Sequence, residues 1–278
     1  MSAPTPAPQS RFAELVQGPE AEIDLATGAL LVAAGEYPQL AVEPYLRRLD
    51  LLAERVRDRV WNETSSLVML QELSHVLFVE EGFRGNSEAY YDPRNSFLND
   101  VLDRKVGIPI TLSVVFLEVG WRLGLPLAGI SFPGHFLVRY DGEAINLLID
   151  PFAEGQVRFE DEAQQLLDGV YGGMVRLRPE FLQPASTRDI LYRILTNLKG
   201  IYLNARDDHR ALAAVEQLLL IRPTAAGEVR DRGMLLARAG RPDEAIADLE
   251  RYLAFAPAAP DATRVRSLIR ELTRHADM

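Results

Sequence analysis

The chain has 278 residues, enough for one large or two modest domains with a buried core. Its formal charge of −10 and isoelectric point near 5.0 argue against nucleic-acid binding, because phosphates are bound by clustered lysine and arginine side chains. The absence of cysteine excludes disulfide bonds, thiolate metal sites and a cysteine nucleophile.

The N-terminus shows no targeting or membrane signal. Residues 1–11 are rich in proline, alanine and serine and precede no long apolar run, so we predict a disordered end and a cytoplasmic protein without a membrane span. No metal or cofactor is predicted either, because the histidines lack the spacing of metal ligands; they are His75, His135, His209 and His275.

Helical periodicity runs from about residue 12 to residue 81. Between residues 40 and 61, apolar side chains recur every three or four positions among arginines and glutamates, which indicates an amphipathic helix: Leu46, Leu49, Leu52, Val56 and Val60. A second helix is predicted from Ser65 to about Gly82. We interpret both as scaffold.

A polar loop is predicted at residues 83–96, with Asn95 as the N-cap of a short helix over residues 97–104. A helix over residues 110–123 then follows Pro109. It is apolar on nearly all sides, which is typical of a buried helix. Its N-terminus would present free amide groups and a partial positive charge, which suit a nucleophile or an oxyanion.

A strand over residues 127–132 and a β-hairpin are predicted next, with hairpin strands at residues 135–140 and 145–150. A two-residue loop places Tyr140 opposite Ile145 and His135 opposite Asp150. Directly opposite residues have Cβ atoms roughly 4.5–5.5 Å apart, so the carboxylate could orient the imidazole. The spacing fits equally a purely structural pair that closes the hairpin.

The sequence pattern changes near Ser186. Before this residue come a helix predicted at residues 159–171 and a linker that contains glycine and proline; after it the pattern is helical throughout. We therefore predict one domain over residues 12–185 and a second, all-helical domain over residues 186–278. Because the linker is short, the two should pack together.

The second domain repeats with the period of tetratricopeptide repeats. Pro223 and Pro257 are 34 residues apart, as are Ala211 and Ala245. Two repeats and a final helix over residues 261–275 are predicted, although Lys199 and Arg232 depart from the repeat pattern. The alternative is a generic bundle of helical hairpins.

Four strings in this order resemble the SirB-type family of bacterial proteins: GFRGNSEAYYDPRNSFLNDVL from Gly82, GIPITLS from Gly107, PGHFLVRY from Pro133 and LLIDPF from Leu147. The resemblance implies an α+β fold. It consists of a helical N-terminal region, a transglutaminase-like (papain-like) core with a small antiparallel sheet, and an all-α tetratricopeptide-repeat domain.

The resemblance also suggests a site. Transglutaminase-like enzymes use a cysteine at the N-terminus of a buried helix, a histidine opening a strand and an aspartate on the next strand. His135 and Asp150 match the last two, but Pro109 stands where the cysteine is expected. Thr111 or Ser113 could act as a substitute nucleophile. The simpler interpretation is that Thr111 caps the helix and Ser113 packs beside it.

Two further polar residues are candidates for the cleft. Asn95 could donate to an oxyanion, although its capping role already explains it. Arg139 shares a strand face with His135 and could hold a ligand carboxylate or pair with a neighbouring acid.

Three functions follow. The first is a non-catalytic or regulatory protein that binds a protein or peptide through its helical repeats, but neither nucleic acid nor a membrane. The second is a hydrolase or acyl-transferase that uses Thr111 or Ser113 with His135 and Asp150. The third is a binder of a small peptide or amide, held by His135 and Arg139.

Overall fold

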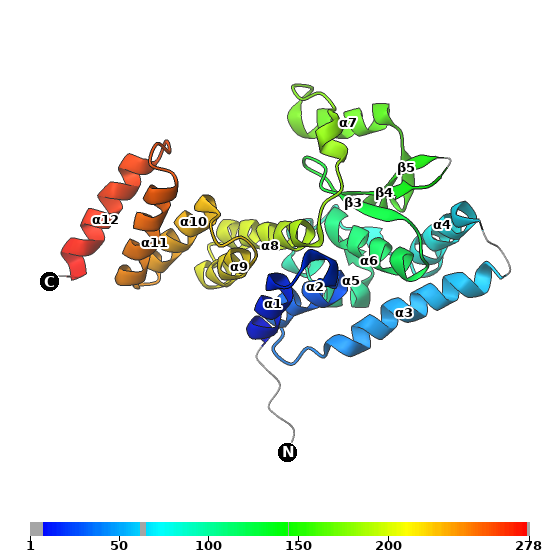
Figure 1. The fold of residues 1–278 in the computed structure, drawn as a ribbon, viewed down its shortest axis with the longest axis horizontal. Coiled ribbons are helices and arrows are strands. Elements are labelled where there is room, and N and C mark those ends of the chain that lie inside the picture. The colour runs from blue at the N-terminus through cyan, green and yellow to red at the C-terminus, as the bar shows by residue number, and fades with distance from the viewer. Residues whose placement is uncertain (1–7, 62–64, 144, 277–278) are drawn as a thin grey trace, which may run out of the picture.

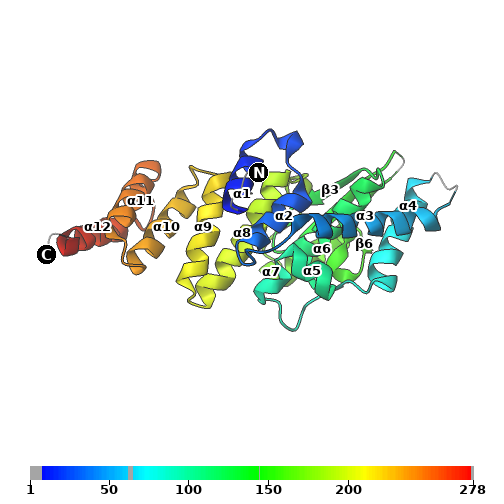
Figure 2. The ribbon, with the colours of Figure 1, turned by 90° about the horizontal axis from the view of Figure 1, so that it is seen from below.

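The structure is a computed structural model that describes residues 8–61, 65–143 and 145–276. It has two parts: a core of helices around a small sheet, and a helical arm that extends from the core with the C-terminus at its far end (Figure 1). The same arrangement is visible from below (Figure 2). The α+β class and the all-helical second part are confirmed.

The N-terminal region is helical, as the sequence predicts. Its helices are α1 (Pro8–Gln17), α2 (Leu25–Ala34), α3 (Val42–Arg59) and α4 (Ser66–Ser74), which continues as a π-helical segment, η2 (His75–Glu80). Helix α1 begins inside the range for which disorder is predicted, because Phe12 and Val16 lie one turn apart and are both buried against the core. The rest of that range, residues 1–7, lies outside the described residues.

The buried helix is α6 (Pro109–Arg122), in which all residues from Pro109 to Gly120 are buried. The loop before it is partly ordered into a short parallel pair, β1 (Arg84–Gly85) with β2 (Val106–Gly107), on either side of α5 (Leu98–Arg104). This pairing fixes the segment between them against the N-terminal end of α6.

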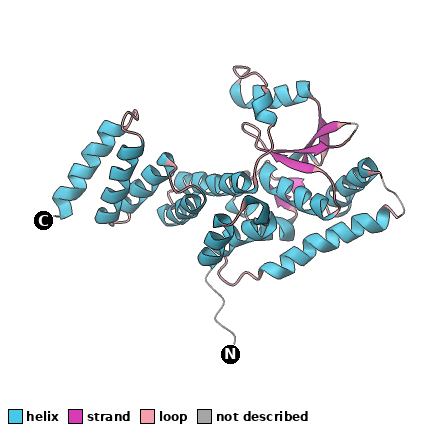
Figure 3. Cartoon of the chain, viewed as in Figure 1, coloured by secondary structure: helices cyan, strands magenta, loops and turns pink. Residues whose placement is uncertain are grey.

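The main sheet is antiparallel and has the strand order β3-β4-β5-β6. Its strands are β3 (Leu127–Ile130), β4 (Leu137–Asp141), β5 (Asn146–Asp150) and β6 (Gln156–Arg158). Helix α6 covers one face and α7 (Glu160–Tyr171) covers the other (Figures 1 and 3). Consequently alternate side chains of β4 enter two cores: Val138 lies in the core with α6, and Leu137 in the core with α7.

The predicted hairpin register is wrong by two residues. Tyr140 pairs with Leu147, not with Ile145, because the turn is longer and closes from the Gly142 N–H to the Ile145 carbonyl. Strand β4 starts at Leu137, so His135 precedes the strand instead of opening it. A shift of two leaves every side chain on the predicted face, since the side-chain period of a strand is two.

The arm consists of α8 (Thr187–Asn204), α9 (Asp208–Ile221), α10 (Ala226–Arg238), α11 (Pro242–Phe255) and α12 (Ala262–Ala276). The two residues that depart from the repeat pattern are matched by acidic partners. Lys199 Nζ lies 2.7 Å from Glu228 and 2.9 Å from Asp231, and Arg232 forms a two-pronged ion pair with Asp248. These charges can therefore be half-buried between repeat helices.

The arm packs against the core, as the short linker predicts. Leu191 of α8 is fully buried and meets α2 at Gly28, where a Cβ atom would lie 2.7 Å from Leu191 Cδ1. Arg188 of α8 also bonds Glu20 of the core at 2.7 Å. One hydrophobic core runs without interruption from the N-terminal helices into the arm.

We expect Leu191→Ala to lower the free energy of unfolding by about 2–5 kcal/mol, because it opens a cavity at this junction. Urea denaturation measures the change. Leu51→Ala is the matched control, since Leu51 is 57% exposed on α3. Equal, small effects of the two substitutions would contradict a packed junction.

Candidate functional site

His135 and Asp150 are in contact. His135 lies in the turn before β4 and Asp150 is the last residue of β5; His135 Nε2 and Asp150 Oδ1 are 2.9 Å apart. An ionised carboxylate can only accept, so Nε2 carries the proton and a neutral ring keeps its lone pair on Nδ1. Nδ1 has no hydrogen-bond partner among the described residues.

Asp150 is buried and has further partners. Its Oδ1 accepts the Phe152 and Ala153 backbone N–H groups, while its Oδ2 accepts from Arg158 of β6, with 3.1 Å between Oδ2 and the nearest guanidinium nitrogen. Burial alone would raise the pKa of Asp150. The hydrogen bond from His135 and the charge of Arg158 outweigh it, so the pKa lies below its ordinary value.

Two aromatic rings pack beside the imidazole. The Phe152 ring meets the His135 ring edge to face, with 6.0 Å between centroids, and Tyr90 packs on Phe152 in the same manner at 6.2 Å. Phe152 in turn sits against Gly85 of β1, where a Cβ atom would lie 2.6 Å from its ring. The polar loop predicted at residues 83–96 therefore lies near the site.

Helix α8 of the arm lines part of the space beside the imidazole. The pocket at His135 holds about 20 Å³, which is room for about one water molecule. Core residues line one side, and Arg193 and Asn197 of α8 line the other. This lining was not predicted, because it depends on how the arm docks and leaves no pattern in the sequence around His135.

The position expected for a nucleophile offers none. Pro109 is the first residue of α6 and lines the His135 pocket, but a proline side chain cannot attack a carbonyl. Thr111 Oγ1 accepts the Ile108 N–H at 3.1 Å and lies 2.6 Å from the Asn95 carbonyl, so it caps the helix. The Ser113 hydroxyl is buried without a hydrogen-bond partner in the described part of the chain. Neither hydroxyl-bearing residue lines the pocket.

The structure gives Asn95 and Arg139 other roles. Asn95 is not the N-cap of α5, which is Phe97; its buried amide donates to the Ala89 and Tyr90 carbonyls and holds the loop, so it is not free to donate to an oxyanion. Arg139 bonds Asp141 and the Leu182 carbonyl and does not line the His135 pocket.

The described residues contain neither a membrane-spanning helix nor a metal-binding group. No helix in ranges 8–61, 65–143 and 145–276 is long and apolar enough to cross a membrane. Within the same ranges, no three or more histidine or acidic side chains form a group that could hold a metal ion.

Family models match both parts of the chain. Residues 43–196 match the transglutaminase-like superfamily, and residues 198–270 match the tetratricopeptide repeat. The chain belongs to the transglutaminase-like superfamily. The first match extends to residue 196 in α8, so it includes Arg193 but not Asn197.

Relatives match over nearly the full length. A UPF0162 protein of Xylella fastidiosa is 37% identical over 90% of each chain, and one of Pseudomonas aeruginosa is 30% identical over 93% of each. The protein SirB1 of Salmonella typhimurium is 27% identical over 84% of this chain and 86% of its own length. The resemblance to the SirB-type family is thereby confirmed.

The lowered pKa of Asp150 predicts a pH dependence. A carboxyl group whose pKa is lower in the folded state stabilises the fold above its unfolded pKa of about 3.8 and loses this contribution as the pH falls below it. We expect Asp150→Asn to be less stable than the parent chain at pH 7, and the difference to shrink below pH 3.8. Thermal unfolding at several pH values measures this; a pH-independent difference would contradict it.

A thiol placed at the N-terminus of α6 would test whether the site still polarises a nucleophile. The helix terminus and His135 should lower the pKa of the thiol introduced by Pro109→Cys below about 7.5. Alkylation rates measured against pH give this value directly, since the chain has no other cysteine.

Two further variants complete this experiment. Adding His135→Ala to the Pro109→Cys chain should return the thiol pKa toward its ordinary value near 8.5. Ser113→Cys, one turn further along the buried helix, should react slowly at any pH because the position is enclosed. An ordinary pKa in the Pro109→Cys chain would show that the polarising environment is lost.

Proposed function

We propose that this protein is a non-catalytic member of the superfamily that binds a protein or peptide through its helical-repeat arm. The observation that carries the proposal is the small size of the pocket at His135. The pocket holds about one water molecule, and among the described residues no serine, threonine or cysteine lines it beside the imidazole. An acyl-transfer site needs both a nucleophile and space for the acyl group.

The arm offers a groove of a suitable size for a partner. It encloses about 600 Å³ between α8, α10 and α12, which are the first helices of successive repeats. Apolar side chains from all three helices contribute to its lining: Leu203, Met234, Ala237, Leu268 and Leu272. Arginines and carboxylates border them. An apolar floor with a charged border is suited to a segment of another protein.

The alternative functions need arrangements that the geometry does not favour. A hydrolase or acyl-transferase needs Thr111 or Ser113 beside the imidazole, whereas Thr111 caps α6 and Ser113 is enclosed. A binder of small peptides or amides at His135 needs a larger pocket and a free Arg139, but Arg139 is engaged by Asp141 and the Leu182 carbonyl.

The test compares a change in the groove with changes elsewhere. Met234→Glu places a charge in the apolar groove, while Leu51→Glu makes the same kind of change on the exposed face of α3. Affinity purification from cells of the source organism, quantified by mass spectrometry, should recover the same partner with the parent chain, Leu51→Glu and His135→Ala. Met234→Glu should lose it, and calorimetry with the purified partner should confirm the loss.

Circular dichroism and melting temperature establish that Met234→Glu is folded. Retention of the same partner by this variant would contradict binding through the groove. Robust amide hydrolysis or amine incorporation by the purified parent chain, abolished by His135→Ala, would contradict the non-catalytic assignment.

A further inference from the structure

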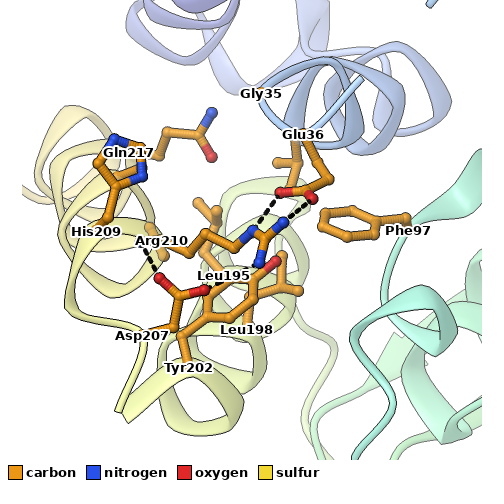
Figure 4. Close-up of a pocket in the computed structure, with 13 residues that line it drawn as sticks. Gly35, Glu36, Phe97, Leu195, Leu198, Tyr202, Asp207, His209, Arg210 and Gln217 are labelled. Atoms are coloured by element: carbon orange, nitrogen blue, oxygen red, sulfur yellow. Dashed lines mark hydrogen bonds and ion pairs between the residues drawn. The ribbon is translucent and has the colours of Figure 1, made fainter. Parts of the chain in front are cut away.

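A second pocket lies at the junction of the core and the arm. It encloses about 390 Å³ between the C-terminal end of α2, the start of α5, and helices α8 and α9 (Figure 4). We call it the junction pocket; it is lined by Val32, Gly35, Glu36, Phe97, Leu195, Leu198, Tyr202, Asp207, His209, Arg210, Ala213, Ala214 and Gln217. Its size lies in the range of small-molecule sites.

Two polar side chains in this pocket are largely buried. Gln217 and Tyr202 are each 7% exposed, and neither the amide nor the phenol forms a side-chain hydrogen bond within the described part of the chain. Figure 4 shows the Gln217 amide turned into the space toward Gly35. The polar ends of both side chains are not among the fully enclosed polar atoms of the described residues, so they reach the space of the pocket. A ligand there could hydrogen-bond them in place of water.

The charges in the pocket disfavour an anionic ligand. Arg210 forms a two-pronged ion pair with Glu36, at 2.7 and 2.9 Å, and also pairs with Asp207 at 2.9 Å. One guanidinium thus faces two carboxylates, and its nitrogens are already engaged. A phosphate or carboxylate would meet net negative charge and no free cation among these three groups.

The rest of the lining is largely apolar and suits an uncharged molecule. Phe97, Leu195 and Leu198 form its apolar wall, and the Arg210 guanidinium lies over the Tyr202 ring, 5.9 Å from the ring centroid. Burial, together with the nearby Glu36 carboxylate, raises the pKa of Tyr202, so its phenol stays a neutral hydrogen-bonding group. The Gln217 amide presents a donor and an acceptor side by side, the arrangement with which glutamine pairs to a nucleobase edge.

We propose that the junction pocket binds the uncharged base of a nucleoside, with Gln217 on its hydrogen-bonding edge and Tyr202 as a second polar contact. Leu195 and Leu198 of α8 line this pocket, whereas Arg193 and Asn197 of the same helix line the pocket at His135. A bound nucleoside therefore braces the helix that lines the pocket at His135. The proposal is independent of the proposed function.

The test titrates the full chain with adenosine, guanosine, uridine and adenosine monophosphate, followed by melting temperature and calorimetry. At least one nucleoside should bind at micromolar to millimolar concentration and raise the melting temperature. Adenosine monophosphate should bind more weakly than adenosine, because its phosphate carries the charge that the pocket disfavours.

Variants locate the binding. Gln217→Leu should weaken nucleoside binding about tenfold to a hundredfold, and Tyr202→Phe should weaken it less. Gln165→Leu, the same change at an exposed position on α7, should leave affinity unchanged. If no nucleoside binds at millimolar concentration, or if Gln217→Leu binds as tightly as the parent chain, the proposal is overturned.

Discussion

Helix α8 packs against the core and is also the first helix of the arm. The position of the arm relative to the core therefore depends on the contacts of this helix. Leu191 presses into the gap left by Gly28, and Arg188 bonds the loop before α2. In the same helix, Lys199 forms ion pairs with Glu228 and Asp231 of α10. Since one helix makes all these contacts, the lining of the pocket at His135 and the direction of the arm are fixed together.

This shared helix bears on how the protein could respond to a partner. Strain applied to the arm is carried to α8 through a continuous apolar core. Any shift of α8 would move Arg193 and Asn197, which line the pocket at His135. The site and the arm are thus mechanically connected even if the site performs no chemistry.

Local sequence patterns predicted a large part of the fold and part of the site. The His135–Asp150 contact was predicted correctly although the register was not: His135 lies in the turn before β4, and from there its ring reaches Asp150 at the end of β5. The burial of α6 and the 34-residue repeat were also readable, since both follow from the spacing of apolar and small residues along one segment. Two features could not be predicted from local patterns: the side chain of Asn95 holds its own loop, and α8, which is distant in the sequence, lines the pocket at His135.

The survival of the histidine–aspartate pair does not require catalysis. Asp150 accepts the first free amides after β5 and binds Arg158 of β6, so its carboxylate secures the sheet edge whether or not the imidazole acts as a base. Pro109 is likewise favourable as the first residue of α6, because the N–H group at this position makes no hydrogen bond within the helix and proline already has the required φ angle. Both features are therefore explained by contacts and backbone geometry within the fold. Acyl-transfer chemistry at the pair would in addition need a nucleophile beside the imidazole and space for the acyl group.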